Sequence, residues 1–385
     1  MALGKVILLS YPAIRAYTMC VPIICIDGTH LKGSYNGKLL LAVAKNANNQ
    51  VLPIAFSIVD NETNASWTWF LEMFQQHVVQ NRKICVISDR HSGILHAMGI
   101  CTSQYGWEHR YCLRHIRSNL MKRYPRNAIR AIKRASPAGW KYLKDSDVRM
   151  WTVYKDHERS RWGNTTTNIA ECVNNVMNHA RMMPIKACIE YTFDYTIKHF
   201  VDQYREAYYW DSPLTKKMWK IYHERELKSQ TYRTTCYDAQ RGLFKVQSTY
   251  QRSGEGGTDY NVEFAAKKCT CGRWQHQRLP CSHAISVCSH LQENASGMAS
   301  KLYTTTVWRE QYNQSENSFN PLRDKSYWAP GDWQIEADAT RIIKHKGRKK
   351  TKRIRNQMDE RERHKPKCGI CRTEGHNKNT CPLRN

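Results

Sequence analysis

The chain lacks any long hydrophobic run, and it has few acidic residues for its size. No apolar stretch approaches the roughly 20 residues that cross a bilayer, and the apolar patch near the start is too short and interrupted for a signal peptide. These absences argue against a membrane partner. Asp and Glu number 33 against 60 Lys and Arg, which gives a net charge of +27. A polyphosphate partner suits such a charge, because its condensed counterions are released on binding.

The remaining composition is that of a folded protein. With 385 residues, 41% of them hydrophobic, 12 Trp and 21 Tyr, the chain can form two or three domains with real cores. Fifteen cysteines could indicate a secreted disulfide scaffold. However, six of them sit at metal-type spacings and nine are scattered, which favours a reducing compartment.

Positive charge is concentrated in two stretches. Residues 109–161 hold 15 basic and 4 acidic residues, and residues 341–385 hold 16 and 4. One such run alone is best explained as a solvated face or tail, but two runs beside metal clusters favour nucleic acid, DNA or RNA. The run Lys344–Arg355 also resembles a nuclear-import signal and predicts a nuclear location. We expect its basic side chains to bind nucleic acid: Lys344, Lys346, Arg348, Lys349, Lys350, Lys352, Arg353 and Arg355.

Two cysteine and histidine clusters have the spacing of structural zinc sites. The first pairs a Cys-x-Cys with a Cys-x-His nine residues later, and its ligands are Cys269, Cys271, Cys281 and His283. The second, near the C-terminus, has the ligands Cys368, Cys371, His376 and Cys381. Four soft ligands at each cluster predict two bound Zn²⁺. The second cluster is typical of knuckles that bind single-stranded nucleic acid, although Ile370 and Asn377 stand where an aromatic residue would stack on a base.

The first 90 residues predict an α/β unit. Ile23–Ile26 is an apolar strand that ends at Asp27, and Leu39–Ala44 and Val51–Val59 form a hairpin in which Pro53 marks an edge or a bulge. Apolar residues at helical spacing follow from Trp67, and Ile84–Ser88 is another strand, which ends at Asp89.

A basic helix is expected from Cys112 to about Arg134, with interruptions at Pro125 and at Pro137–Gly139. Further helices are expected from near Asn168 and from Pro184 to about Tyr209. In the helix from Ile169, the apolar residues are expected on one face: Ile169, Cys172, Val173, Val176 and Ala180. Glu171 then shares the opposite face with Asn174, Asn175 and Asn178, and that face is either solvent-exposed or the wall of a polar cleft.

Three carboxylates are candidates for metal-dependent chemistry. Each has a structural explanation on its own: Asp27 precedes Gly28 as in a turn, Asp89 could cap a helix, and Asn168-x-x-Glu171 has the spacing of a capping box. Together they suggest more, because carboxylates at the ends of neighbouring strands can converge on one point. Asp27, Asp89 and Glu171 could then place Mg²⁺ or Mn²⁺ for in-line attack on a phosphodiester.

Three histidines and one cysteine stay ambiguous in the sequence. Cys112-x2-His115 is either half of a zinc site or a buried cysteine with a histidine on the helix surface. His30 and His91 follow the two aspartates and could orient a phosphate, although a structural role is the simpler interpretation.

The motifs, taken in order, resemble those of plant Mutator-like element (MULE) transposases. The similarity runs through IDGTHLKGSYNG, ISDRHSGI, YCLRHIRSN, GNTTTNIAECVN, CTCGRWQHQRLPCSH and KCGICRTEGHNKNTCP. The resemblance implies an RNase H-like α/β catalytic domain with helical additions and an Asp–Asp–Glu triad at Asp27, Asp89 and Glu171. It also implies a SWIM zinc finger at 269–283, a CCHC knuckle at 368–381, and strand cleavage and transfer at the terminal inverted repeats of a DNA element, usually by multimers.

The expected fold is therefore α/β, an RNase H-like domain plus two small zinc-binding modules. The predicted boundaries are 1–210 for the transposase domain, 211–258 for a polar connection, 259–292 for the SWIM finger, 293–340 for an aromatic loop-rich segment, 341–365 for a basic linker and 366–385 for the knuckle. The chain departs from the family in having little sequence ahead of Asp27, a shorter helical region after Asp89, and GRKK in place of GRPKK. These departures keep a second hypothesis open, a catalytically inactive transposase derivative that regulates by binding nucleic acid.

Overall fold

The computed structural model describes residues 5–34, 36–123, 137–153, 156, 161–248, 258–313, 315, 317–321, 371 and 381–382. The basic run Lys344–Arg355 and the ligands Cys368 and His376 lie outside these residues, so the linker and the terminal zinc site stay predictions. The chain divides into two compact units, residues 1–115 with 147–351 and residues 116–146 with 352–385. Across the described helices, none combines the length and apolar character that a membrane span requires.

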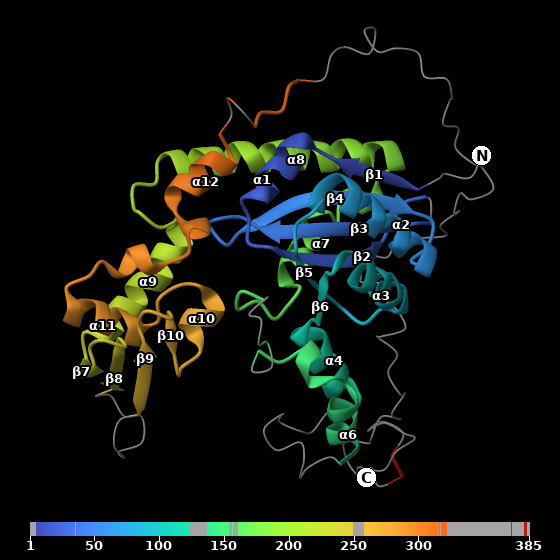
Figure 1. Ribbon diagram of the computed structural model, residues 1–385. Helices are drawn as coiled ribbons and strands as arrows, with labels where there is room; N and C mark the ends of the chain where they lie inside the picture. The colour runs from blue at the N-terminus through green and yellow to red at the C-terminus, as the bar shows by residue number, and fades with distance from the viewer. Residues whose placement is uncertain are drawn as a thin grey trace. The chain divides into compact units, whose positions relative to one another are not determined.

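The first unit is built on a six-stranded mixed sheet in the order β1-β4-β3-β2-β5-β6 (Figure 1). Its strands are β1 (Val6–Leu9), β2 (Ile23–His30), β3 (Lys38–Lys45), β4 (Val51–Val59), β5 (Cys85–Ser88) and β6 (Glu108–Tyr111). The strands β1, β4, β3 and β2 pair antiparallel with their neighbours in that order, whereas β2, β5 and β6 pair parallel. A three-stranded meander continued by two parallel strands with helical crossovers is the RNase H-like arrangement that the resemblance implies.

Side-chain alternation along the strands creates a hydrophobic core on each face of this sheet. In β2, Ile24 and Ile26 belong to one core, while Ile23 and Cys25 belong to the other. In β5, Val86 faces the first core, and Cys85 and Ile87 face the second. Both strands are therefore buried on both sides, as expected for central strands with parallel neighbours.

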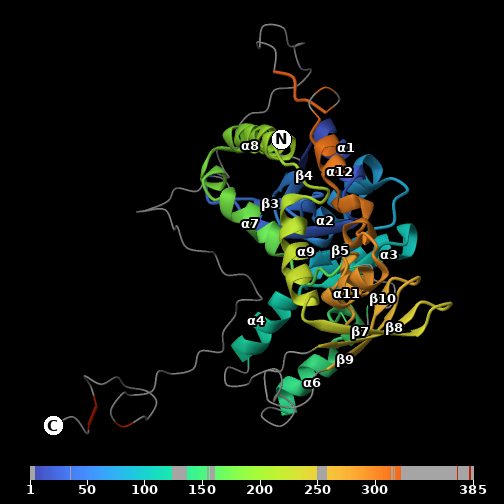
Figure 2. The same ribbon diagram turned by 90° about the vertical axis from the view of Figure 1, so that its left-hand side faces the viewer.

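Helices cover the two faces. The first core receives side chains from helices that are spread along the chain: α1 (Tyr11–Thr18), α2 (Asn64–Phe74), α3 (Ser92–Tyr105), α8 (Ile185–Tyr208) and α12 (Thr305–Gln311). The π-helical turn Gln75–Val79 extends α2. Figures 1 and 2 both show α12 beside α1, although almost 300 residues separate them. The second core receives side chains from α7 (Asn168–Val176), α9 (Lys216–Ser229), the first turn of α8, and α11 (Ser282–Leu291).

The hairpin of β3 and β4 is confirmed, and the pairing slips by one residue between Ala42 and Val43, opposite Pro53. Pro53 therefore lies at a bulge, one of the two predicted settings for it. The turn predicted at Asp27-Gly28 is wrong. β2 continues through both residues, because β3 pairs with it as far as His30.

The second sheet extends the zinc finger beyond its ligands. It has the order β10-β9-β8-β7, from β7 (Tyr232–Asp238), β8 (Leu243–Ser248), β9 (Asp259–Glu263) and β10 (Lys268–Cys269). The short helix α10 (Arg273–Gln277) and the helix α11 (Ser282–Leu291) follow. Two of its strands and α9 come from residues 211–258, which the sequence presents only as a polar connection.

The 3₁₀ turns Ala180–Met182, Ala295–Met298 and Lys301–Tyr303 complete the ordered elements between and after these helices. Another 3₁₀ turn, Val148–Met150, lies ahead of α7.

The predicted basic helix corresponds to α4 (Leu113–Arg123), and residues 124–136 lie outside the description. The second unit also contains α6 (Pro137–Asp145). Pro137 marks a helix boundary as predicted, because α6 begins there, whereas Ala138 and Gly139, also predicted to interrupt the helix, lie inside α6. Proline fits the first helical turn, where its missing N–H has no intrahelical partner to lose.

Candidate functional site

Asp27 lies in β2, and Asp89 directly follows β5, the parallel neighbour of β2. β2 and β5 pair parallel, with Ile23 opposite Cys85 and Cys25 opposite Ile87. The same offset carried two residues further places Asp27 opposite Asp89. Because side chains alternate along a strand, both aspartates project from the same face as Cys25 and Ile87. The predicted convergence of these two carboxylates therefore follows directly from strand register.

Helix α7 packs on that face and brings Glu171 to the aspartates. It contacts β2, and its buried residues are Ala170, Val173 and Asn174. The predicted apolar face is only partly buried, since Val173 and Ala180 are buried but Cys172 and Val176 are exposed. The helix is rotated so that part of its polar face, with Asn174, meets the sheet. Of the two expectations for that face, solvent or a polar cleft, the second holds at Asn174.

The capping box predicted at Asn168 is not formed. Thr167 is the N-cap residue, without a side-chain cap, and Asn168 is already the first helical residue. The side chain of Asn168 instead accepts a hydrogen bond from Arg114 at 3.1 Å. Glu171 therefore does not form the capping box that the spacing suggested.

Both oxygens of Asp27 are held by donors. Oδ1 accepts from the Gly28 backbone N–H at 3.1 Å, and Oδ2 accepts from Asn174 Nδ2 at 2.7 Å. Burial raises the pKa of Asp27 to about 7, and the negative charges of Asp89, Glu62 and Glu171 add to this effect. Asp89 Oδ1 accepts from the His91 N–H at 2.9 Å, so it fixes the turn that leads into α3 instead of capping the helix itself.

Glu62 is a fourth carboxylate at this site that the sequence did not reveal. It lies in the loop between β4 and α2, and a Cβ placed on Gly28 would approach its Oε1 to 2.7 Å. Trp67 Nε1 donates to Oε1 at 3.2 Å, and Lys38 Nζ lies 3.9 Å from Oε2. Burial raises the pKa of Glu62, and the charge of Asp89 raises it further. Glu62 precedes an ordinary helix start, so only the folded chain shows that it faces Asp27.

Glu171 is engaged by basic residues from the start of α4. Arg114 forms an ion pair with its Oε2, and His115 Nε2 lies 3.6 Å from Oε1. Among the described residues, the ligand atoms of the three predicted acids do not all lie within 4.8 Å of one another. The structure therefore places Glu171 beside the two aspartates but holds its carboxylate with Arg114.

His115 and Cys112 form a polar pair beneath the acids. Cys112 is fully buried, and its sulfur accepts from both N–H and Oγ1 of Thr167, each at 3.3 Å. Burial opposes ionisation of both groups, yet their mutual interaction outweighs it, so the pKa of Cys112 falls to about 7 and that of His115 rises to about 9. The charges of Asp89 and Asp27 also stabilise protonated His115. Within the described residues these two belong to no cluster of three or more metal-type ligands.

The other two histidines have structural partners. His91 is the N-cap of α3 and accepts from Gly93 N at 3.2 Å, and its Nδ1 lies 3.6 Å from Glu62. His30 Nε2 lies 2.9 Å from Lys38 Nζ, and burial together with nearby cations lowers its pKa to about 4. Both therefore match the structural interpretation better than phosphate binding.

The donor set of this site fits a hard divalent cation. Four carboxylates lie within electrostatic reach of one another, and carboxylate oxygens are the ligands that Mg²⁺ and Mn²⁺ prefer. Two of them, Asp27 and Glu62, have raised pKa values because burial and like charge disfavour ionisation. A bound cation would remove this penalty. Asp27 and Asp89 would hold it, with the charges of Glu62 and Glu171 nearby.

The first cysteine and histidine cluster is brought together as predicted. The four ligand atoms of Cys269, Cys271, Cys281 and His283 all lie within 4.8 Å of one another. His283 Nδ1 is 3.5 Å from Cys269 Sγ and 4.0 Å from Cys281 Sγ. In a tetrahedral site, Zn–S and Zn–N bonds of about 2.3 and 2.0 Å separate sulfur from nitrogen by about 3.5 Å. The cluster therefore has the dimensions of a structural zinc site.

Neighbouring residues hold both halves of this cluster. Gln275 makes two hydrogen bonds to the backbone of Cys269, at 3.1 and 2.8 Å, and Gly272 turns the chain after Cys271 with φ of 75°, which favours glycine. Cys281 is the N-cap of α11, and its sulfur accepts from Ala284 N at 3.5 Å. A helix N-terminus stabilises a thiolate.

The ring of His283 stacks between two tyrosines. Its centroid lies 3.9 Å from that of Tyr260 and 5.2 Å from that of Tyr232. From α9, Arg225 donates to the carbonyls of Leu279 and Pro280 at 3.1 and 2.9 Å, just ahead of Cys281. The ligand positions therefore depend on residues far outside the cluster.

Comparison with known proteins agrees with this geometry. Residues 23–119 match the model of the MULE transposase domain, and residues 260–292 match that of the SWIM zinc finger. The chain carries a MULE transposase domain and a SWIM zinc finger. The MULE match includes Asp27, Glu62 and Asp89 but ends before Glu171, and the SWIM match includes all four ligands of the first cluster.

Other comparisons add little. No curated protein shows a significant match to the chain. The HTLV-2 integrase catalytic core domain in complex with magnesium (trimeric form) is similar at 18% identity, with 34% of this chain and 88% of that chain covered and a TM-score of 0.20. The RNase H-like assignment of the MULE domain therefore depends on its strand order and not on this likeness.

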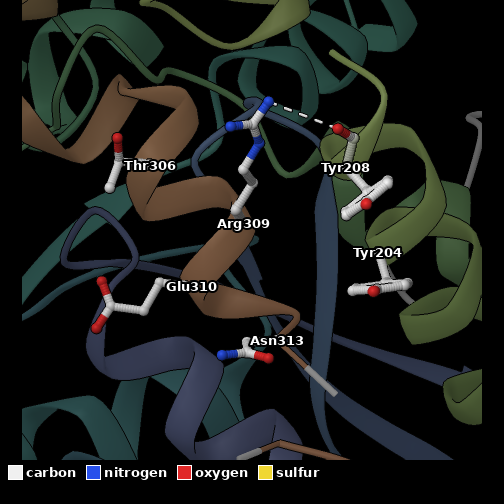
Figure 3. Close-up of a pocket in the computed structure, with 6 residues that line it drawn as sticks. All are labelled: Tyr204, Tyr208, Thr306, Arg309, Glu310 and Asn313. Carbon is white, nitrogen blue, oxygen red and sulfur yellow. Dashed lines mark hydrogen bonds between the residues drawn. The ribbon is translucent and has the colours of Figure 1, made fainter. Parts of the chain in front are cut away.

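A separate hollow of about 430 Å³ lies between α8 and α12, away from the acids of the MULE domain (Figure 3). Arg309 lines this hollow. Its guanidinium donates to the backbone carbonyls of Ala207 and Trp210 at 3.1 and 2.6 Å and also to the backbone carbonyl of Tyr208 at 3.5 Å. These bonds satisfy carbonyls at the C-terminal end of α8. The guanidinium of Arg309 thus joins α12 to the end of α8, and its presence in the hollow needs no ligand to explain it.

Proposed function

We propose that this transposase-derived protein binds zinc and DNA and carries out divalent-metal-dependent phosphodiester cleavage and strand transfer at the terminal inverted repeats of a DNA element. Asp27, Asp89 and Glu171 are the proposed catalytic acids. One observation carries the proposal: Asp27 in β2 and Asp89 just after β5, its parallel neighbour, lie close enough for their charges to interact, and α7, which carries Glu171, contacts β2.

Each residue has a distinct part in this proposal. Asp27 and Asp89 bind the cation, and the donors Gly28 and Asn174 keep the carboxylate of Asp27 oriented. Glu171 approaches from α7 once its ion pair with Arg114 opens. When bound, Mg²⁺ or Mn²⁺ supplies activation of a water or a 3′-hydroxyl and stabilises the leaving oxygen.

The proposed DNA partner rests on charge and on the zinc modules. The net charge of +27 provides for binding to the phosphate backbone, and the linker Lys344–Arg355 and the terminal knuckle are proposed to contact DNA or a single strand. The same linker is proposed to direct the protein to the nucleus. Paired element ends would require two copies of the chain, so a homo-oligomer is part of the proposal.

Cleavage of a labelled terminal-inverted-repeat DNA tests the catalytic part. Wild type should cut with Mg²⁺ or Mn²⁺, and Asp89→Asn should not. Asp211→Asn, which changes an exposed aspartate outside the site, serves as the matched control and should cut like wild type. Equal cutting by Asp89→Asn would show that another centre performs the reaction.

A second function is favoured by the state of Glu171. Its carboxylate is paired with Arg114, and the three acids are not gathered within 4.8 Å. This arrangement also suits a catalytically inactive, zinc-dependent nucleic-acid-binding regulator of transposase descent. DNA binding without cutting by wild type under either metal would select this alternative.

A further inference from the structure

A buried amide lies against the candidate cation site, and only one of its two polar atoms has a partner. Asn174 is 8% exposed. Its Nδ2 donates to Asp27 Oδ2 at 2.7 Å, whereas its Oδ1 is buried and accepts no hydrogen bond among the described residues. An unsatisfied buried acceptor costs about 1–3 kcal/mol. Stability alone therefore does not explain an asparagine here.

The neighbouring carboxylate determines which way the amide points. Ionised Asp27 can only accept a hydrogen bond, so Asn174 must turn its NH₂ group toward it. The amide oxygen is then left without a partner on the residue that contacts Asp27, and the charge of Asp27 interacts with those of Asp89, Glu62 and Glu171. An oxygen among ionised carboxylates can be satisfied by a donor or by a cation, and ionised carboxylates supply no donor.

The other asparagines of this segment differ from Asn174. Asn175 is exposed to solvent, and Asn178 is partly buried but its Oδ1 accepts from Lys32 Nζ at 3.2 Å and from Arg181. Asn174 follows Glu171 by three residues, so both lie on the same side of α7. Of these three asparagines, Asn174 combines burial, contact with Asp27 and an unused oxygen.

We propose that Asn174 supplies an uncharged oxygen to the divalent cation held by Asp27 and Asp89, while its Nδ2 positions the Asp27 carboxylate. This inference rests on the proposed function, because it deepens the same metal site. Amide oxygens are suitable ligands for hard cations and add no negative charge to a site that already gathers four carboxylates.

The test is Mn²⁺ binding to the zinc-loaded full chain, followed by the electron paramagnetic resonance signal of free Mn²⁺. Asn174→Leu removes the oxygen and the donor and should weaken Mn²⁺ binding about 10-fold or more. Asn174→Asp removes the donor but keeps an oxygen, so it should bind Mn²⁺ at least as tightly as wild type. Asn175→Leu and Asn175→Asp are the matched controls on the exposed side and should stay within about twofold of wild type.

The two Asn174 variants separate oxygen supply from a structural role. If the hydrogen bond to Asp27 were the whole contribution, both would weaken Mn²⁺ binding alike, and the inference would be overturned. Unchanged binding by Asn174→Leu would overturn it as well. Far-UV circular dichroism and zinc content confirm that each variant is folded.

One further variant separates this inference from the proposed function. If Asp89→Asn loses Mn²⁺ binding while Asn174→Leu retains it, only the role of Asn174 fails. If Asp89→Asn binds Mn²⁺ as tightly as wild type, the acids are not the cation site, and both proposals fail together.

Discussion

Replacing Asp27 by asparagine should stabilise the metal-free protein at alkaline pH. The folded chain raises the pKa of Asp27 from 3.8 to about 7, because the carboxyl is buried among other acids. Its protonated form is thus favoured by folding. This preference is fully expressed below the unfolded pKa of 3.8 and is lost as pH rises to about 7, so ionised Asp27 opposes folding above that pH.

The size of the effect follows from the same values. A difference of about three between the folded and unfolded pKa corresponds to about 4 kcal/mol at pH 8, and to less than about 1 kcal/mol near pH 4. The side-chain amide that Asp27→Asn introduces would keep the acceptor for Gly28, and the amide of Asn174 could flip so that its Oδ1 accepts from the new NH₂ group. The substitution therefore removes the charge without creating an unsatisfied group.

Urea unfolding of the zinc-loaded protein at pH 4.5 and pH 8, in buffer stripped of other divalent ions, measures this difference. Asp27→Asn should unfold at higher urea than wild type at pH 8, and the gap should shrink at pH 4.5. Added Mg²⁺ should stabilise wild type but not the variant. An equal gap at both pH values, or a less stable variant at pH 8, would refute the electrostatic reasoning.

Three further changes test other parts of the structure. Cys281→Ala removes one ligand of the SWIM site, and bound zinc measured by atomic absorption should fall by one per chain. Glu62→Gln should weaken Mn²⁺ binding about 10-fold and also stabilise the metal-free protein at pH 8, since it relieves repulsion with Asp89. Arg114→Ala should cost under about 1 kcal/mol in urea unfolding, because Arg114 is 56% exposed, yet it should tighten Mn²⁺ binding by freeing Glu171.

For each of these three variants, one result would contradict the prediction. Unchanged zinc content in Cys281→Ala would mean that the cluster does not hold a metal. Normal Mn²⁺ affinity in Glu62→Gln would leave this residue with a structural role over Gly28. Weaker Mn²⁺ binding in Arg114→Ala would indicate that Arg114 supports the site instead of competing for Glu171.

The sequence predicted those features of the site that depend on local periodicity. Asp27 and Asp89 follow apolar strands, and parallel register alone suffices to bring them together. The zinc ligands of the SWIM finger were predicted from spacing for the same reason, since each pair is a short local clamp. Glu62 and Arg114 were not predicted as partners of the acids. Nothing near them in the chain shows that folding brings them to Asp27 and Glu171.

The errors also have physical causes. The periodicity of α7 was correct, but Val176 and Cys172 were expected inside, and the sheet instead selects Asn174 because it can bond to Asp27. Strand β7 was missed because it has no fully buried residue, and β8 was missed because it buries only Phe244 and Val246. The pairing of β7 with β8 and of β8 with β9 is visible only in the folded chain.

The second sheet has a consequence for how this protein can be divided. The SWIM match begins at residue 260, yet the sheet continues into earlier residues, because β8 pairs with β9 and β7 pairs with β8. Tyr232, one of the two rings that flank His283, lies on that earlier segment. A fragment cut at the family boundary would carry all four zinc ligands but lose half of its sheet and one wall of its metal pocket. A fragment meant to hold this zinc site should therefore begin ahead of Tyr232 and not at residue 260.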